Sequence, residues 1–235
     1  MNTRIIVAVL ALCASFASVA AEKAHPPRSG ILPVKDSQKG RIAFVNKQSR
    51  LPLADIESAA QQVAKDTQCR VEVGSAEGAQ VVIEIVDSKD EPTLTAFPED
   101  YKARVNVAKI DVGLSGDAVK KFYFSRCRKE LLRAFCFACG TAGTQYRNNI
   151  MTVAKLQDLD LVGEFIPGDT TYICQSRLKE IGVTPMQFVS YAQACRQGWA
   201  PAPTNVTQQR IWDHIKEMKE KGPTSPIKIS PPNKK

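Results

Sequence analysis

Runs of apolar and β-branched residues predict four strands in the first half of the chain. We expect these strands, in chain order, at residues 41–46, 70–73, 79–86 and 102–112. Three of the runs hold valine or isoleucine in groups or at every second position, and the last alternates Val105 and Val107 with polar residues. Both patterns are typical of strands that bury one or both faces. Residues 91–100 are expected to form a loop, because their two prolines lack the N–H that a strand ladder needs.

Helical spacing predicts two amphipathic helices in the same region. Residues 52–67 repeat apolar side chains at steps of three and four, at Leu53, Ile56, Ala60 and Val63. A longer helix begins at Gly116 or Asp117 and ends at Gly140, since glycine is favoured just after a helix. Its apolar stripe runs through Phe124, Cys127, Leu131, Phe135 and Ala138. The order of strand, helix, three strands and helix predicts an α/β (α+β) fold with a sheet layer.

The second half of the chain is expected to be mainly helical. Residues 152–182 look loop-rich with short helices, one of them around "YICQSRLKEIG". Thr184 is followed by Pro185 and Gln187, a capping box with a proline start, which predicts a helix beginning there. A final helix is predicted from about Val206 to Lys219. We therefore divide the folded part into a main domain, 41–182, and a C-terminal helical extension, 183–221.

The two ends of the chain are predicted to lie outside the folded core. Residues 1–21 have a positive start at Arg4, an apolar run and small residues before a cleavage point, which are the marks of a secretory signal peptide. We expect an exported protein, periplasmic or extracellular, with no transmembrane segment after cleavage. Residues 22–40 and 222–235, rich in proline and charge, are expected to be a flexible arm and a flexible tail.

The charge is strongly basic. The formal net charge of the chain is +8, and loss of residues 1–21 removes only one charged residue, Arg4. Such a balance can attract an anionic surface polymer, but it also simply keeps an exported protein soluble. Basic residues recur along the long helix, either as an anion-binding stripe or as a solvated face, at Lys120, Lys121, Arg126, Arg128, Lys129 and Arg133. We expect no nucleic-acid partner, because no aromatic platforms interleave with these residues and the protein is exported.

Six cysteines remain beyond the predicted signal peptide: Cys69, Cys127, Cys136, Cys139, Cys174 and Cys195. An oxidising compartment allows disulfides, but their connectivity cannot be deduced from sequence. Several of the six fall on apolar faces, where reduced cysteine packs as a small hydrophobic residue. We expect most of them to be buried, with disulfides as the alternative.

The stretch "CRKELLRAFCFACG" at residues 127–140, with Met151 after a loop, resembles part of a known family. Over roughly residues 41–182 the element order is similar to that of the metzincin zinc peptidases, and within them to the archaemetzincins. Their signature is His-Glu-x-x-His-x-x-Gly-x-x-His, followed by a methionine turn. Two histidines four residues apart reach one zinc ion, the glutamate is a general base, and the glycine bend brings in the third histidine. The resemblance implies a mixed twisted sheet with a long active-site helix packed on it.

The sequence departs from that signature at every ligand position. With Glu130 on the family's glutamate, Lys129 and Arg133 take the first two histidine positions. Cys136 takes the glycine position and Cys139 the third histidine position. Lysine and arginine are cations at neutral pH and do not replace neutral imidazole on zinc. Glu130 and Arg133, three residues apart, also fit an ordinary helix ion pair.

The cysteines at the end of this helix have several interpretations. Cys136 and Cys139 fit small residues packed near a helix end, a redox pair, or ligands of a metal shared with Cys174 or Cys195. The archaemetzincins carry a second, cysteine-rich zinc site that ends in Cys-x-x-Cys. Here only Cys174 falls in that region, with Arg177 in place of its partner.

Three functional hypotheses follow. The leading one is an exported, non-catalytic pseudo-peptidase without a cofactor, which binds a peptide or an anionic surface polymer in a relic cleft around positions 129, 130, 133, 136, 139 and 151. One alternative is a metal-dependent peptidase or hydrolase with Glu130 as base and zinc on Cys136, Cys139 and Cys174. The other is a structural envelope protein held by disulfides. The oligomeric state stays open.

Overall fold

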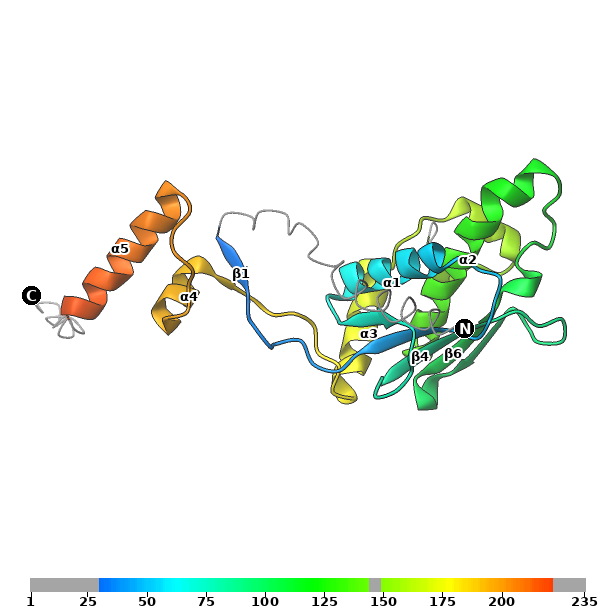
Figure 1. The fold of residues 1–235 in the computed structure, drawn as a ribbon, viewed down its shortest axis with the longest axis horizontal. Helices are drawn as coiled ribbons and strands as arrows, with labels where there is room; N and C mark the ends of the chain where they lie inside the picture. Colours follow the sequence, from blue (N-terminus) through cyan, green and yellow to red (C-terminus); the bar gives the residue numbers. More distant parts are fainter. Residues whose placement is uncertain (1–29, 144–148, 222–235) are drawn as a thin grey trace, which may run out of the picture. The chain divides into compact units, whose positions relative to one another are not determined.

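The structure of the protein is a computed structural model that describes residues 30–143 and 149–221. The chain divides into two compact units (Figure 1). The larger spans Val34–Gln187, and the smaller combines the residues up to Pro33 with Phe188–Lys235. The predicted signal peptide, the first part of the predicted arm and the predicted tail lie outside the described residues. Within the described ranges, no helix is long and apolar enough to cross a membrane.

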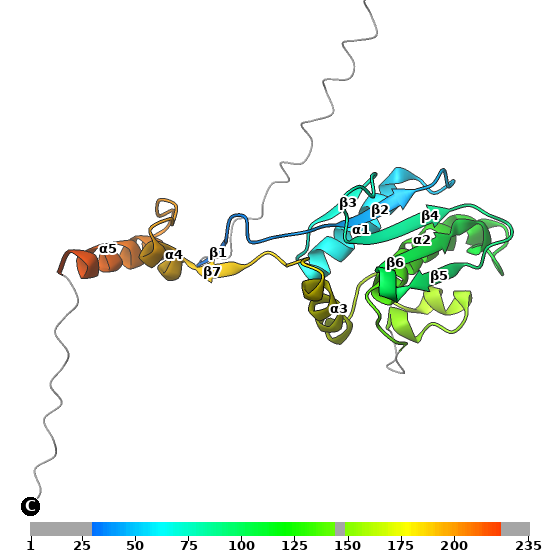
Figure 2. The same cartoon turned by 90° about the horizontal axis from the view of Figure 1, so that it is seen from below.

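The larger unit is built on a five-stranded sheet with the order β3-β2-β4-β6-β5 (Figure 2). Its strands are β2 (Ile42–Asn46), β3 (Val71–Val73), β4 (Val81–Val86), β5 (Leu94–Phe97) and β6 (Lys102–Asn106). Neighbouring strands are parallel except β5, which runs antiparallel to β6 at the edge. The predicted mixed α/β fold is confirmed.

The edge strand β5 lies where the prolines predicted a loop, so that prediction was wrong. The strand occupies four of the five residues between Pro92 and Pro98, and neither proline is part of it. Its ladder with β6 runs from Leu94 opposite Val105 to Phe97 opposite Lys102. An edge strand needs hydrogen bonds on one side only, and therefore tolerates prolines next to it.

Strand β6 is shorter than the predicted strand at residues 102–112. The side chain of Asn106 accepts a hydrogen bond from the Ala108 N–H at 3.1 Å and donates to the carbonyl oxygens of Ser88 and Glu91 at 2.6 and 2.8 Å. These bonds end the strand and start the 3-10 turn η2 (Val107–Lys109). The alternation of Val105 and Val107 therefore continues past the end of the strand.

Three helices complete the larger unit: α1 (Leu53–Thr67), α2 (Asp117–Ala138) and α3 (Gly168–Glu180). Side chains from α1, α2 and α3 form one core with those on one face of the sheet, among them Phe44, Ile83 and Val105. The opposite face has only a small buried cluster of Ala43, Val45 and Val82. The sheet thus carries its main core on the face where the helices pack.

The predicted stripe of α2 is largely confirmed. Cys127, Leu131, Phe135 and Ala138 are fully buried, whereas Phe124 is 38% exposed and does not belong to the stripe. The helix ends as glycine allows: Gly140 has a φ of +75°, and its N–H donates to the carbonyl oxygen of Phe137 at 2.9 Å. Helix α2 therefore lies with its stripe against the sheet and its other sides toward the rest of the unit.

The smaller unit pairs β1 (Ile31–Pro33) with β7 (Phe188–Ser190) and adds α4 (Tyr191–Gln197) and α5 (Val206–Lys221). Its core consists of Leu32, Tyr191, Ala194, Cys195 and Ile215. The predicted last helix is confirmed as α5. Part of the predicted arm is structured, because β1 lies in it.

The helix predicted to begin at Thr184 begins instead at Tyr191, so the capping box was a wrong signal. The Oγ atom of Ser190 accepts the Gln193 N–H at 3.1 Å and caps α4. Thr184 has another role: its Oγ1 atom accepts the Lys39 N–H at 3.1 Å and donates to the Ser37 carbonyl at 3.0 Å. These bonds join residues 37–39 to the segment that follows α3 in the larger unit.

Candidate functional site

Helix α2 carries the positions that align with the zinc-peptidase signature, with Cys139 as its C-cap. Residues 149–164 pack along the helix and include two 3-10 turns, η3 (Ile150–Thr152) and η4 (Leu156–Leu161). Backbone and side-chain groups of this segment bind the polar side chains of α2. The candidate site is thus a layer of polar contacts between one helix and the chain that follows it.

Lys129 is buried, with 6% of its surface exposed. Its Nζ atom donates a hydrogen bond to the carbonyl oxygen of Leu159 at 2.7 Å. Burial lowers the pKa of Lys129 because it penalises the charged form. The side chain at the first ligand position therefore serves to hold η4 on the helix.

Glu130 and Arg133 form a buried ion pair. The Nη1 atom of Arg133 lies 2.6 Å from Oε2 of Glu130. The side chain of Arg133 is 12% exposed and that of Glu130 is 2% exposed. Arg133 also donates from Nη2 to the carbonyl oxygen of Val153 at 3.1 Å and lies 5.6 Å from the ring centre of Phe137. Burial raises the pKa of Glu130, and the charge of Arg133 opposes that rise. The helix ion pair expected from the sequence is therefore present, and the carboxylate is held by its partner.

The other basic residues of α2 that the structure describes in this region also point inward. Arg126 is 1% exposed and donates two hydrogen bonds to the carboxylate of Asp160, from Nε at 2.8 Å and from Nη2 at 2.6 Å. Arg128 pairs with Glu164 and Asp55. For Arg126, Arg128, Lys129 and Arg133 neither an anion-binding stripe nor a solvated face is correct, because their charges are bound inside the unit. Lys121 is exposed, as a solvated face predicts, and the side chain of Lys120 lies outside the described residues.

Met151, expected at the methionine turn, is 3% exposed and belongs to the main core. Its N–H donates to Oδ1 of Asn149 at 2.8 Å, which caps η3. The residue thus lies in a turn that packs next to α2. Its burial fits plain core packing as well as a relic of the family's turn.

Three thiols meet at the end of α2. Cys136, Cys139 and Cys174 are fully buried and belong to the same core. The neighbouring thiols of Cys136 and Cys139 lower the pKa of Cys174, while burial raises the pKa of Cys136 well above its usual range. The pKa of Cys139 is also raised, by the neighbouring Cys174 and by burial. Cys69 belongs to the same core, and all four are unpaired.

The structure shows the three thiols in contact but not as a set of metal ligands. Among the described residues, no group of three or more His, Cys, Asp or Glu side chains is arranged to hold a metal ion. The zinc ligands proposed from sequence, Cys136, Cys139 and Cys174, are therefore brought together without the arrangement that zinc requires. A redox role of Cys136 and Cys139 is also disfavoured, since reactive thiols are partly exposed and have a depressed pKa.

Comparison with solved structures agrees with this architecture. An archaemetzincin from Methanopyrus kandleri is similar with a TM-score of 0.50 and 16% identity, over 62% of this chain and 99% of that one. The chain has an archaemetzincin-like fold. A zinc-dependent peptidase from Methanocorpusculum labreanum has a TM-score of 0.44 and 12% identity, over 57% of this chain and 100% of that one. An archaemetzincin from Archaeoglobus fulgidus, complexed with malonate, has a TM-score of 0.43 and 14% identity, over 57% and 99%.

Sequence comparison gives no match: no protein-family model fits the chain, and no curated protein matches it. The structure thus reveals an archaemetzincin-like fold that the sequence comparisons do not detect. At such low sequence identity a shared fold does not imply a shared activity, so the chemistry of the site depends on the residues present in this chain.

The residues of this archaemetzincin-like unit do not fit a catalytic zinc ion. Lys129 and Arg133 have no free lone pair for a metal while they are charged, and both are committed to carbonyl or carboxylate oxygens. Cys139, at the third ligand position, is fully buried beside Cys174. No reaction step through zinc can be built on this site.

Sequence reasoning missed the partners of the helix. The acceptors for Lys129 and Arg133 are backbone carbonyl groups of Leu159 and Val153, which no side-chain pattern reveals. Asp160 and Glu164 did offer a signal, as acidic residues in a stretch that follows a basic helix. Their distance along the chain from Arg126 and Arg128 hid the pairing.

Proposed function

We propose that this archaemetzincin-like chain is an exported, non-catalytic protein that binds an extended peptide at the edge of its sheet. The observation that supports the proposal is that the side chains at the signature positions are bound to other groups of the protein. Glu130 is 2% exposed and its carboxylate is bound to Arg133, so it presents no oxygen to solvent with which to act as a base. Lys129 and Arg133 are structural residues.

Export is supported by the sequence of residues 1–21. The basic start, apolar stretch and small residues match the three regions of a signal peptide. The protein would then work in the periplasm or outside the cell. Its substrate-like partner would be a peptide or polymer of that compartment.

The relic zinc position itself is a poor place for a ligand. Lys129 and Glu130 are buried and Arg133 is partly buried, and Lys129 and Arg133 bind backbone carbonyl groups of Leu159 and Val153. A peptide could therefore reach these side chains only by displacing the segment that carries those carbonyl groups. Two pockets lined by described residues lie elsewhere on the larger unit, one over β4 and β6 and the other between α1 and β3. The binding surface we propose is therefore the edge strand.

Strand β5 offers that surface. The Asn106 N–H donates to the Thr93 carbonyl, so in the antiparallel ladder Thr95 and Phe97 face β6 and the backbone groups of Leu94 and Ala96 face away. The part of the chain that the structure describes provides no backbone partner for these outward groups. An extended peptide can add to such an edge as a further strand.

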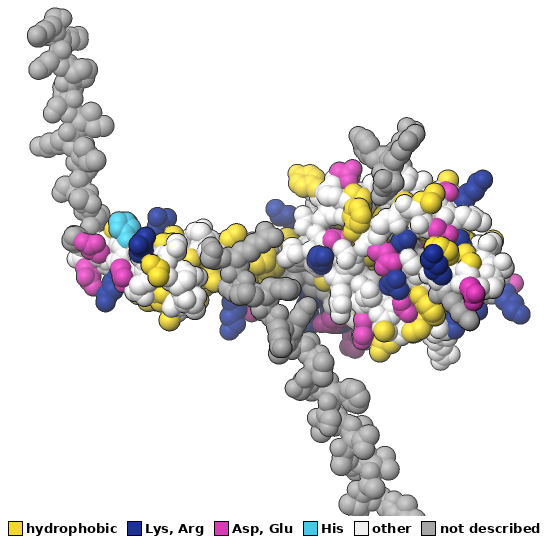
Figure 3. Space-filling model, turned by 90° about the horizontal axis from the view of Figure 1, so that it is seen from above, with side chains coloured by type: hydrophobic (Ala, Val, Ile, Leu, Met, Phe, Trp, Pro, Cys, Tyr) yellow, Lys and Arg dark blue, Asp and Glu magenta, His cyan; other side chains and the backbone are white. Residues whose placement is uncertain are grey.

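An anionic polymer is the less favoured partner. On the face of the larger unit seen in Figure 3, Lys and Arg side chains alternate with Asp and Glu side chains. Several of its basic residues are also neutralised in ion pairs, such as Arg41 with Glu72 and Arg104 with Glu84. A surface of mixed sign attracts polyanions weakly.

Metal analysis tests the non-catalytic part of the proposal. The mature protein, purified without chelators, is expected to contain far less than one zinc ion per chain and to leave peptides uncut with or without added zinc. Elemental mass spectrometry and a fluorogenic peptidase assay measure both. One zinc per chain would overturn the proposal. Loss of that zinc in the double variant Cys136→Ser with Cys139→Ser would then identify a thiolate site, and retention of the zinc would point to other ligands.

Replacing Ala96 with proline tests the peptide part. The change removes an outward N–H without touching the ladder to β6, and loss of one main-chain hydrogen bond is expected to weaken peptide binding about tenfold. Fluorescence anisotropy with a labelled pool of tryptic casein peptides measures the affinity. Ala96→Ser keeps the N–H and should bind as the unmodified protein does. Equal binding by Ala96→Pro would contradict addition at this edge.

A further inference from the structure

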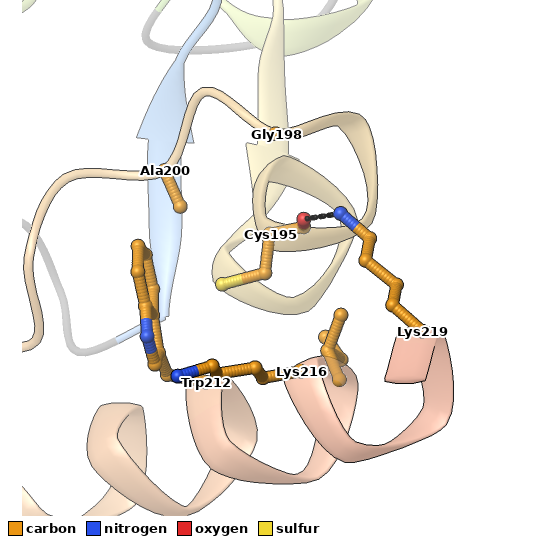
Figure 4. A pocket seen from close by; sticks show the side chains of 7 residues that line it. Cys195, Gly198, Ala200, Trp212, Lys216 and Lys219 are labelled. Carbon is orange, nitrogen blue, oxygen red and sulfur yellow. Dashed lines mark hydrogen bonds between the residues drawn. The ribbon is translucent and has the colours of Figure 1, made fainter. Parts of the chain in front are cut away.

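The smaller unit contains a pocket of about 240 Å³ between α4 and α5 (Figure 4). Its walls come from Cys195, Gly198, Ala200, Trp212 and Ile215, and from Lys216 and Lys219. This unit lies outside the segment that holds the signature positions, and nothing in the proposed peptide site uses it. The pocket therefore needs an account of its own.

The interior of the pocket is apolar. The indole of Trp212 lies across from the thiol of Cys195, with Ala200 above the indole in the view of Figure 4. Ile215 and Cys195 belong to the core of the unit, and Trp212 and Ala200 pack against that core. A cavity bounded by such groups favours a hydrocarbon or aromatic body.

The charged part of the lining has a single sign. Lys216 and Lys219 are exposed and come from α5 one turn apart, and none of the seven lining residues is acidic. Lys219 donates one hydrogen bond from Nζ to the carbonyl oxygen of Cys195 at 3.1 Å. An ammonium group has three donors, so this bond fixes Lys219 at the pocket and leaves donors for a ligand.

We propose that this pocket binds a small amphiphilic carboxylate, with its apolar tail against Trp212 and Ile215 and its carboxylate between Lys216 and Lys219. The volume lies below the usual range of about 300–1,000 Å³ for drug-sized ligands, so the tail is short, as in a medium-chain fatty acid. The two lysines supply the charge complementarity and the apolar walls supply the tail contact. The helix pair α4 and α5 thus forms a ligand site that is independent of the archaemetzincin-like unit.

Titration with sodium octanoate tests this site. The chain has only two tryptophans, and Trp199 is 40% exposed with its Nε1 bound to Gln197, so Trp199→Phe leaves Trp212 as the sole indole reporter. Octanoate is expected to change the Trp212 emission in a saturable way. Octanol, which has the same tail without the charge, should bind about tenfold more weakly, because both exposed lysine contacts are lost.

Matched lysine variants separate the specific contact from net charge. In the Trp199→Phe background, Lys216→Gln is expected to weaken octanoate binding about threefold and to leave octanol binding unchanged. Lys65→Gln removes the same charge from an exposed position on α1, in the other unit, and should have no effect. The proposal is overturned by an emission that does not saturate, by equal affinity for octanoate and octanol, or by equal effects of the two lysine variants.

Discussion

Replacing Arg133 with methionine is expected to lower the free energy of unfolding by about 3–5 kcal/mol, because it leaves the carboxylate of Glu130 buried without its partner. The side chain of Glu130 is only 2% exposed, so water cannot solvate its carboxylate once Arg133 is gone. The change also removes the donor to the Val153 carbonyl and the contact with the Phe137 ring. Urea unfolding followed by circular dichroism measures the effect.

The double variant Glu130→Gln with Arg133→Met shows whether the ion pair is responsible. With both charges removed, most of the lost stability should return, since an uncharged buried pair has a much smaller desolvation cost. Glu130→Gln alone completes the double-mutant cycle and gives the coupling energy. Losses that simply add would mean that the two residues act separately.

The cost of Arg133→Met should also depend on pH. Burial already raises the pKa of Glu130 in the folded protein, and removal of Arg133 takes away the charge that opposes this rise. A carboxyl group whose folded pKa exceeds its unfolded value of about 4.3 destabilises the fold above that value, and the penalty is relieved as pH falls through the folded pKa. The difference between variant and unmodified protein should therefore be larger at pH 8 than at pH 5. A difference that grows on acidification would contradict this assignment.

Replacing Arg126 with methionine is the second large effect, with an expected loss of about 2–4 kcal/mol. The guanidinium makes two hydrogen bonds to Asp160 and one each to the carbonyl oxygens of Ile110 and Val112, at 3.3 and 3.0 Å. Asp160 is 22% exposed and regains water, which makes the loss smaller than for Arg133. Urea unfolding gives the global effect, and hydrogen exchange across residues 156–161 gives the local one.

Arg128→Met is the matched control for that experiment. Arg128 also binds an acidic residue of the covering segment, Glu164, but its side chain is 24% exposed. Arg128 also binds Asp55, but its side chain is more exposed than the 2% of Arg126, so its ion pairs are better screened by water and this variant should cost less than Arg126→Met. Equal losses, or unchanged exchange in η4 after Arg126→Met, would show that Arg126 does not fasten the segment.

The parts of the fold that sequence predicted are those with a long, regular pattern. Helix α2 could be located because its apolar residues recur at steps of three and four and a glycine follows them, and four strands were visible as β-branched runs. Strand β5 was missed because four residues between two prolines carry no periodicity, and its stability comes from pairing with β6. The start of α4 was misplaced because Thr184 has the residue type of a cap but uses its hydroxyl elsewhere.

The sequence predicted which residues form the candidate site, but not how most of them are bound. Aligning Glu130 with the family's glutamate located the site on α2, and the Glu130–Arg133 pair followed from spacing alone. That Lys129 would be buried did not follow, because its acceptor is a backbone carbonyl thirty residues away. The convergence of Cys174 on Cys136 and Cys139 was proposed only through the family resemblance, because no local pattern shows that α3 places Cys174 in the same core.

The buried pair of Glu130 and Arg133 has an evolutionary consequence. Any single substitution that removes the guanidinium at position 133, the histidine of the family signature included, would leave the carboxylate of Glu130 in the core without its partner. A change at Glu130 alone would likewise leave Arg133 without its acceptor. We therefore expect the two positions to change together in evolution, because either single change passes through a less stable protein.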